Sequence, residues 1–302
     1  MSNVFRFREG QPVTWFNRNA SESNQFCLYC GRRVGSNAEI ESNKEHLIGR
    51  NFVPKGSLAG DAFNFVFRAC IECNTEKSDA ERHVSTVSLF NSPARLVDLS
   101  INDLAARKAS NDHHPTERRL VRDASVPHKI ETEGNGFSGT LHMTSPPQLE
   151  YKSVLLLAVR QIQGLFALIS TEDPRVPEKS KLLAADKVLL HKDYNYGDWG
   201  NPQLIEIIER TKGWSAPLFV NSASGHFKAI LRIPKSQEEG YFWALEWNKS
   251  VRIVGAICHP SQYPVWLKDL PQLKWWSIPG KDCRIRMETP LRGIPDHLFT
   301  TE

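Results

Sequence analysis

Two cysteine pairs of identical spacing constrain this chain more than any other feature. They read "CLYC" at residues 27–30 and "CIEC" at residues 70–73. A CxxC turn places two thiolates on one side of a metal ion, and two such turns complete the tetrahedral four-sulfur site of structural zinc. We therefore predict one zinc ion, with an iron–sulfur cluster as the alternative. The predicted ligands are Cys27, Cys30, Cys70 and Cys73. A closed site of this kind braces the chain and does not catalyse.

Composition places these thiols in a reducing, cytoplasmic setting. The N-terminal stretch "MSNVFRFREGQPVTWF" lacks the apolar run and cleavage site of a secretory signal. In the cytoplasm clustered cysteines are metal ligands or catalytic groups more often than disulfides. The net charge of +4 and the isoelectric point of 8.7 permit a nucleic-acid partner without requiring one. The most apolar run, residues 154–169, is too short to span a membrane and carries Arg160, so we expect a buried helix and no membrane partner.

The pattern along the 302 residues predicts two parts. Residues 1–125 form the first domain, with its core motif at 26–90. Its "NTEKSDAERHVSTVSLF" and "ARLVDLSINDLAARKA" segments favour helices. Turn-forming and polar residues gather between 110 and 150, which places the boundary there.

Residues 126–302 are predicted to form an α+β domain with antiparallel strands. Strand content is expected near 136–144, and helices near 151–170, 178–190 and 202–212. Two later segments, "PLFVNSASGHFKAILRIP" and "YFWALEWNKSVRIVGAIC", each have two β-branched or aromatic runs joined by a polar turn, which is typical of β-hairpins. The fold class expected for the whole chain is α+β.

The residues between the cysteine pairs resemble the HNH, or ββα-metal, endonuclease superfamily of the four-cysteine type. An acidic residue followed by histidine appears as Glu45 and His46 in "KEHLIGR", where members commonly carry Asp-His. A central asparagine, Asn64, precedes the second pair in "FNFVFRAC". The second pair then runs into a helix as "CIECNTEK", which supplies Asn74. The resemblance covers roughly residues 26–90 and implies a zinc-braced strand–strand–helix module.

This resemblance implies roles for the residues it matches. His46 is the expected general base, since imidazole can take a proton from water at neutral pH. Glu45 and Asn74 are the expected oxygen ligands of one catalytic divalent cation, which the resemblance implies to be Mg²⁺ or another divalent cation. His83 is an alternative ligand, too far along the same helix to share the ion with Asn74. Asn64 would orient the imidazole or brace the loop. The expected phosphate contacts are Arg50, Lys55, Arg68 and Lys77.

Each of these residues also has a purely structural interpretation. His46 can be a hydrogen-bonded structural residue, and Glu45 a solvated surface carboxylate. Asn74 can be a helix N-cap, because asparagine is favoured there. Asn64 can be a turn residue. His83 and the four basic side chains can simply be solvated surface groups.

The function expected from the resemblance is metal-dependent hydrolysis of DNA, in duplex form, by an HNH endonuclease. Within the superfamily the chain looks most similar to restriction or anti-phage defence nucleases, such as the HNH effector of the Zorya system. Defence-system proteins or a second copy of the chain are the implied partners, because one HNH site cuts one strand. Two alternatives stay open. One is a non-catalytic, zinc-dependent nucleic-acid-binding module, and the other is a nuclease gated by a ligand or partner through the C-terminal domain.

Overall fold

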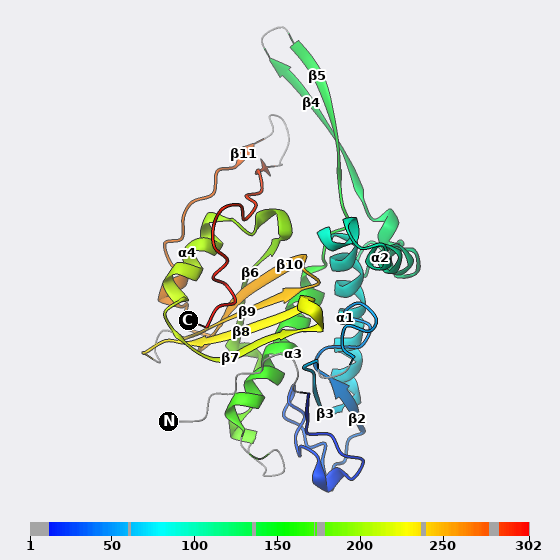
Figure 1. Ribbon diagram of the computed structural model, residues 1–302, viewed down its shortest axis with the longest axis vertical. Helices are drawn as coiled ribbons and strands as arrows, with labels where there is room; N and C mark the ends of the chain where they lie inside the picture. The colour runs from blue at the N-terminus through cyan, green and yellow to red at the C-terminus, as the bar shows by residue number, and fades with distance from the viewer. Residues whose placement is uncertain are drawn as a thin grey trace.

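The computed structural model describes residues 12–59, 62–134, 137–171, 173, 179–236, 240–277 and 284–301. Figure 1 shows a five-stranded sheet beside a bundle of helices, with a smaller sheet at one end and a long hairpin at the other. Helices and antiparallel strands are both present, so the predicted α+β class is confirmed.

The N-terminal part is built on a three-stranded sheet followed by a long helix. Its strands are β1 (Val13–Thr14), β2 (Ser42–His46) and β3 (Phe65–Cys70). The central strand β3 pairs antiparallel with β2 and parallel with β1. Alternate residues of β3 face the core, where Phe65 and Phe67 are fully buried. Helix α1 (Ile71–Phe90) starts directly after β3, so β2, β3 and α1 follow one another as strand, strand and helix.

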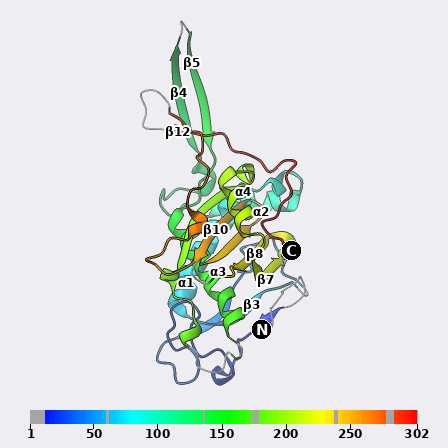
Figure 2. The ribbon, with the colours of Figure 1, turned by 90° about the vertical axis from the view of Figure 1, so that its left-hand side faces the viewer.

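A second helix and a projecting hairpin follow. Helix α2 (Leu99–Asn111) has Asp98 as its N-cap, and the carboxylate of Asp98 accepts hydrogen bonds from the backbone of the first turn. Strands β4 (Val126–Gly134) and β5 (Phe137–Ser145) then pair along their full length. The two views show this hairpin extending away from the body of the protein (Figures 1 and 2).

The C-terminal part is an antiparallel sheet in the order β6-β10-β9-β8-β7. These strands are β6 (Val188–Asn195), β7 (Ser215–Ser222), β8 (Phe227–Ile233), β9 (Tyr241–Trp247) and β10 (Val251–Ile257). Helix α3 (Tyr151–Ser170) contributes to the core on one face, and helix α4 (Pro202–Thr211) to the core on the other. Alternate side chains of β9 point to opposite faces of the sheet, so Trp243 lies in the core that contains α3 and Phe242 in the core that contains α4.

Short elements complete the described chain. Strands β11 (Trp276–Ser277) and β12 (Arg284–Ile285) pair with each other. The 3₁₀ helices are η1 (Ala20–Glu22), η2 (Pro93–Leu96), η3 (Val121–Asp123), η4 (Lys179–Lys181), η5 (Ala185–Lys187), η6 (Tyr196–Asp198), η7 (Ala223–Gly225) and η9 (Val265–Leu267).

One predicted helix is wrong. Residues 178–190 were expected to be helical, but their described part forms two 3₁₀ turns and then enters β6. Apolar residues in this stretch have no single period, and β6 pairs with β10 from Val188 onward. Tertiary pairing therefore decides the local structure. The two predicted hairpins are found as β7–β8 and β9–β10.

The two predicted parts share one hydrophobic core across the expected boundary at 125/126. Leu47 and Phe67 from the N-terminal sheet belong to the same buried cluster as α3 and the inner face of the large sheet. At Gly164 of α3, an added Cβ would lie 2.5 Å from Leu47 Cδ1, so any other residue here would require the Leu47 side chain to move. Gln163 of α3 also donates to the Tyr29 carbonyl at 2.9 Å.

Helix α3 is long and apolar enough to cross a membrane by length and composition, but it lies inside this core. Its most apolar window is 61% buried within the protein. The expectation of a buried helix is confirmed.

Candidate metal centre and basic pocket

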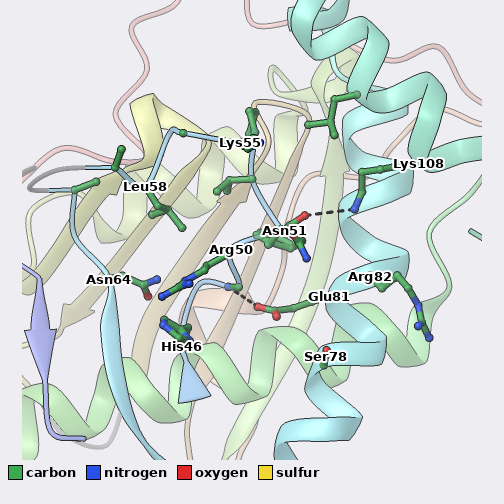
Figure 3. Close-up of a pocket in the computed structure, with 18 of the residues that line it drawn as sticks. His46, Arg50, Asn51, Lys55, Leu58, Asn64, Ser78, Glu81, Arg82 and Lys108 are labelled. Carbon is green, nitrogen blue, oxygen red and sulfur yellow. Dashed lines mark hydrogen bonds between the residues drawn. The ribbon is translucent and has the colours of Figure 1, made fainter. Parts of the chain in front are cut away.

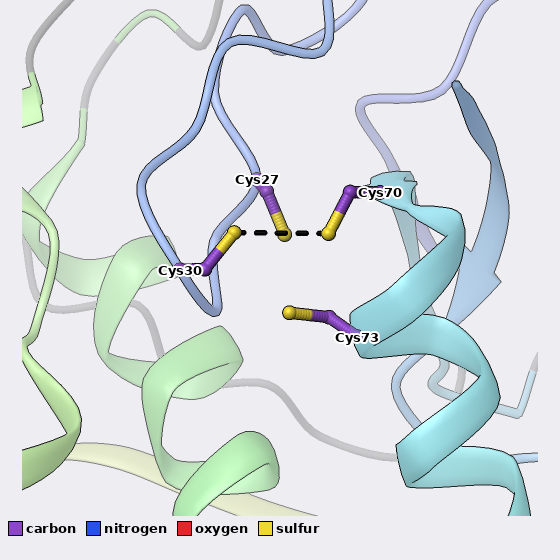
Figure 4. Close-up of side chains that lie close together, drawn as sticks. All are labelled: Cys27, Cys30, Cys70 and Cys73. Carbon is purple, nitrogen blue, oxygen red and sulfur yellow. Dashed lines mark hydrogen bonds between the residues drawn. The ribbon is translucent and has the colours of Figure 1, made fainter. Parts of the chain in front are cut away.

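The four cysteines of the CxxC pairs converge on one point, as Figure 4 shows. Two come from a loop closed by a backbone hydrogen bond from Cys27 N to the Arg32 carbonyl, and two from the junction of β3 and α1. All four sulfur atoms lie within 4.8 Å of one another, and Cys30 Sγ is 3.7 Å from Cys70 Sγ. Ligands at the Zn–S length of about 2.3 Å stand about 3.8 Å apart in a tetrahedron. The cluster therefore has the dimensions of a structural zinc site.

Two of the four thiols have a lowered pKa, whereas hydrogen bonds from the other three cysteines raise the pKa of the Cys27 thiol. Hydrogen bonding from Cys27, together with the neighbouring Arg32, lowers the pKa of Cys30 to about 4. The same Cys27 thiol is the main cause that lowers the pKa of Cys70 to about 6. Arg32 donates to both of these sulfurs at 3.3 Å. The thiolates of Cys30 and Cys70 are the kind of donor that zinc prefers.

His46 ends β2 and lines a pocket of about 1060 Å³ (Figure 3). Its ring makes no hydrogen bond with any residue that the structure describes. Burial is the main cause that lowers its pKa to about 4, and the charges of Lys44, Arg50 and Lys77 act in the same direction. The imidazole is therefore uncharged at neutral pH and has a free lone pair.

The backbone that follows His46 is fixed on both sides. Asn64 accepts a hydrogen bond from Ile48 N at 3.0 Å and donates to the Ile48 carbonyl at 2.8 Å. Leu47 N bonds to the Phe65 carbonyl at 2.8 Å. Of the two roles expected for Asn64, the structure shows the contact that braces the loop.

A buried cluster of charged side chains also holds the loop that follows His46. Lys77 Nζ donates to the His46 carbonyl at 3.0 Å and lies 2.7 Å from a carboxylate oxygen of Glu45 and of Glu81. Glu81 accepts in turn from Gly49 N at 3.0 Å. Since the lysine has three donors, all of them are used. The loop is thus rigid, while the imidazole it carries is left without a partner.

The expected cation ligands do not lie with His46. Successive residues of a strand point to opposite faces, so Glu45 faces the helix and His46 the pocket. The Glu45 carboxylate is buried, paired with Lys77, and accepts from the Tyr29 hydroxyl at 3.0 Å. Glu45 is therefore not a solvated surface group.

Asn74 is also absent from the residues that line the pocket. It lies in the first turn of α1, where its amide donates to Asn43 Oδ1 at 2.6 Å. The N-cap of α1 is Cys70, so the capping role does not apply either. Glu45 and Asn74 do not form a cation site beside the candidate base, and the residues present do not fit the expected Mg²⁺ arrangement.

His83 is buried and lies against other partners. Its Nε2 accepts a hydrogen bond from Glu150 N at 2.9 Å, and its ring packs edge-on to His114. Burial and the charge of His114 lower its pKa to about 4. It lines a separate hollow of about 520 Å³, so it is neither a surface residue nor a ligand beside His46.

The four expected phosphate contacts divide into two pairs. Arg50 and Lys55 line the pocket with His46. Lys77 is 1% exposed and fully engaged, so it cannot reach a substrate. Arg68 lies on β3 with its guanidinium over the Phe16 ring, and donates to the Asn17 carbonyl at 2.7 Å. Neither Lys77 nor Arg68 is among the residues that line the pocket.

The sequence prediction missed one whole wall of the pocket, which two helices provide. On α1 the lining residues are Ser78, Glu81 and Arg82, and on α2 they are Leu104, Arg107, Lys108 and Asn111. Both sets have the i, i+3, i+4 spacing of one helix face, which is the signal that could have identified them.

The charge of the pocket suits an anion. Among the described residues its cationic side chains are Arg50, Lys55, Arg82, Arg107 and Lys108, and its carboxylates are Glu81 and Asp112. Both carboxylates already have partners, Lys77 for Glu81 and the Thr86 hydroxyl for Asp112. In the described chain no carboxylate pairs with Arg50, Lys55 or Arg107. Phosphate groups would supply the missing negative charge.

Comparison of the chain with protein-family models, with curated proteins and with solved structures finds no match. The four-cysteine centre and the basic pocket are therefore interpreted from their own chemistry. The four cysteines come from the N-terminal loop and from the junction of β3 and α1, and His46, at the end of β2, lines the pocket.

Proposed function

We propose that the protein is an HNH-type endonuclease that hydrolyses DNA phosphodiester bonds in the basic pocket. One observation carries the proposal: a rigid loop presents an uncharged imidazole without a partner into a pocket rich in unpaired cations. The strand–strand–helix order and the four-cysteine centre support the same assignment.

His46 acts as the general base in this proposal. It takes a proton from water as the oxygen attacks phosphorus, and the bond from phosphorus to the leaving oxygen breaks. Arg50 lies on the same side of the pocket as His46 in Figure 3 and balances the charge that develops on the phosphoryl oxygens. Bound phosphate also offsets the positive charges that lower the pKa of His46, which makes the imidazole a stronger base in the complex.

No step of this proposal passes through a divalent cation, because Glu45 and Asn74 do not lie beside His46. Dependence on Mg²⁺ is therefore part of the test. Zinc in the cysteine centre has a structural role. The cytoplasm, and restriction or anti-phage defence, are the setting that the HNH resemblance favours.

Cleavage of supercoiled plasmid tests the proposal. The wild type, His46→Ala and the control His259→Ala are compared with and without Mg²⁺, and zinc content is measured for each. His259 is an exposed histidine outside the pocket, so its loss should leave cleavage unchanged. Nicking by the wild type and the control, but not by zinc-loaded His46→Ala, supports the assignment. Equal cutting by all three proteins refutes it.

A non-catalytic nucleic-acid-binding module is the second candidate. It is favoured by the absence of Glu45 and Asn74 from the described lining of the pocket. Salt-dependent DNA binding by a wild-type protein that cuts nothing, in any combination of metal and nucleotide, would establish this function instead. Cutting that requires an added nucleotide or partner would establish the gated form.

A further inference from the structure

The pocket reaches well beyond the candidate base. A sphere of its volume is about 13 Å across, whereas successive phosphates advance by about 3.4 Å per nucleotide along a duplex strand. The scissile phosphate at His46 fills only part of such a space. The far wall belongs to α2, which lies outside the segment that resembles HNH enzymes.

The α2 wall presents cations that the protein does not neutralise. Arg107 is exposed and has no carboxylate partner in the described chain. Lys108 is partly buried, and its side-chain amine donates to the Asn51 carbonyl at 3.3 Å and pairs with no carboxylate of the described residues. Figure 3 shows it extending from α2 toward the loop that carries Arg50 and Lys55.

The electrostatic surroundings of Lys108 also favour a bound anion. Burial is the main cause that lowers its pKa, and the neighbouring Arg107 and Arg82 lower it further, while Asp112 opposes them. Arg82 has its own partner, Asp79, at 2.8 Å. Like charges held together in a protein are stabilised by a bound anion.

We propose that Arg107 and Lys108 form a second phosphate subsite, which holds a backbone phosphate on the strand whose scissile bond lies at His46. This subsite rests on the proposed nuclease function and sets the length of strand that the enzyme engages. It predicts that substrates too short to reach α2 lose affinity but are still cut.

Salt-dependent binding tests the subsite. Arg107→Gln/Lys108→Gln is placed in the His46→Ala background and compared with the control Lys268→Gln/Arg292→Gln, which removes two exposed charges outside the pocket. A labelled DNA duplex is titrated between about 50 and 200 mM salt without added divalent cation. Each lost phosphate contact lowers the slope of log K against log salt by about 0.9. We expect the pocket variant to lose about 1 to 2 in slope and about tenfold in affinity at low salt.

Cleavage kinetics separate this inference from the proposed function. With His46 intact, the pocket variant should keep the wild-type kcat and show a raised KM on long DNA only. On trinucleotides its KM should equal that of the wild type. Slopes and KM values that match the control refute the subsite, while plasmid cleavage by the wild type leaves the nuclease assignment standing. A wild type that neither binds nor cuts DNA refutes both.

Discussion

The buried cluster of Lys77, Glu45 and Glu81 makes a sharp prediction about stability. The Lys77→Met variant keeps the apolar stem but removes a charge that is 1% exposed and in contact with two buried carboxylates. Breaking a buried ion pair on one side costs about 3–5 kcal/mol, because the partner is left charged and desolvated. For a chain of 302 residues this corresponds to a fall of about 5 to 8 °C in Tm.

The loss should depend on pH in a defined direction. Burial already raises the pKa of Glu81, despite the opposing charge of Lys77. Without the lysine, the pKa of Glu81 rises further above the unfolded value. A carboxyl whose pKa is raised in the folded state destabilises it at high pH, and the penalty disappears as the group is protonated. The variant should therefore approach the stability of the wild type as pH falls from 8 toward 5.

Urea unfolding at several pH values measures both effects. Lys187→Met is the matched control, because Lys187 is exposed and makes no side-chain contact that the structure describes. The triple variant Lys77→Met/Glu45→Gln/Glu81→Gln removes all three charges and should recover most of the loss. Equal stability of Lys77→Met and the control at pH 8, or a triple variant as weak as the single one, would refute the reasoning.

Three further predictions concern other features. The wild type should contain one zinc ion per chain by atomic emission, and Cys73→Ser should lose it and unfold at a lower temperature. Burial lowers the pKa of His83 and of His226 to about 4, so the unfolded state binds more protons than the folded state between about pH 6.5 and 4. The free energy of unfolding should therefore fall as the pH is lowered from about 6.5 to 4, and it should fall less steeply in His83→Gln/His226→Gln. Asn248→Ala removes a fully buried amide that donates to the Phe52 carbonyl at 3.1 Å, and should cost about 1–3 kcal/mol in urea unfolding with no loss of zinc.

Sequence reasoning was most successful where local chemistry decides the structure. The cysteine spacing identified the cluster that could hold a metal ion, and the sequence pattern identified α3 to the residue, as well as the hairpins of the large sheet. It failed at 178–190, where pairing with β10 overrides a short pattern without a clear period. Such pairing depends on residues far away in the chain, which no local window contains.

The candidate site shows the same division between local and distant information. The alternation of β2 alone implies that Glu45 and His46 point to opposite faces. This rule could have argued against a cation held by Glu45 beside His46. The ion pair between Glu45 and Lys77 could not be predicted without knowing how α1 packs on β2. The pocket wall on α2 likewise depends on tertiary packing, although the spacing of Arg107 and Lys108 with Leu104 and Asn111 marks one face of that helix.

The core that joins Leu47 and Phe67 to α3 also governs how the chain folds during synthesis. The cysteines are synthesised early. The apolar side chains beside them stay uncovered until α3, which carries Gly164, has been synthesised. Until then the nascent N-terminal half exposes apolar surface to solvent. A chain terminated before α3 would leave these apolar side chains permanently uncovered and would be prone to aggregation.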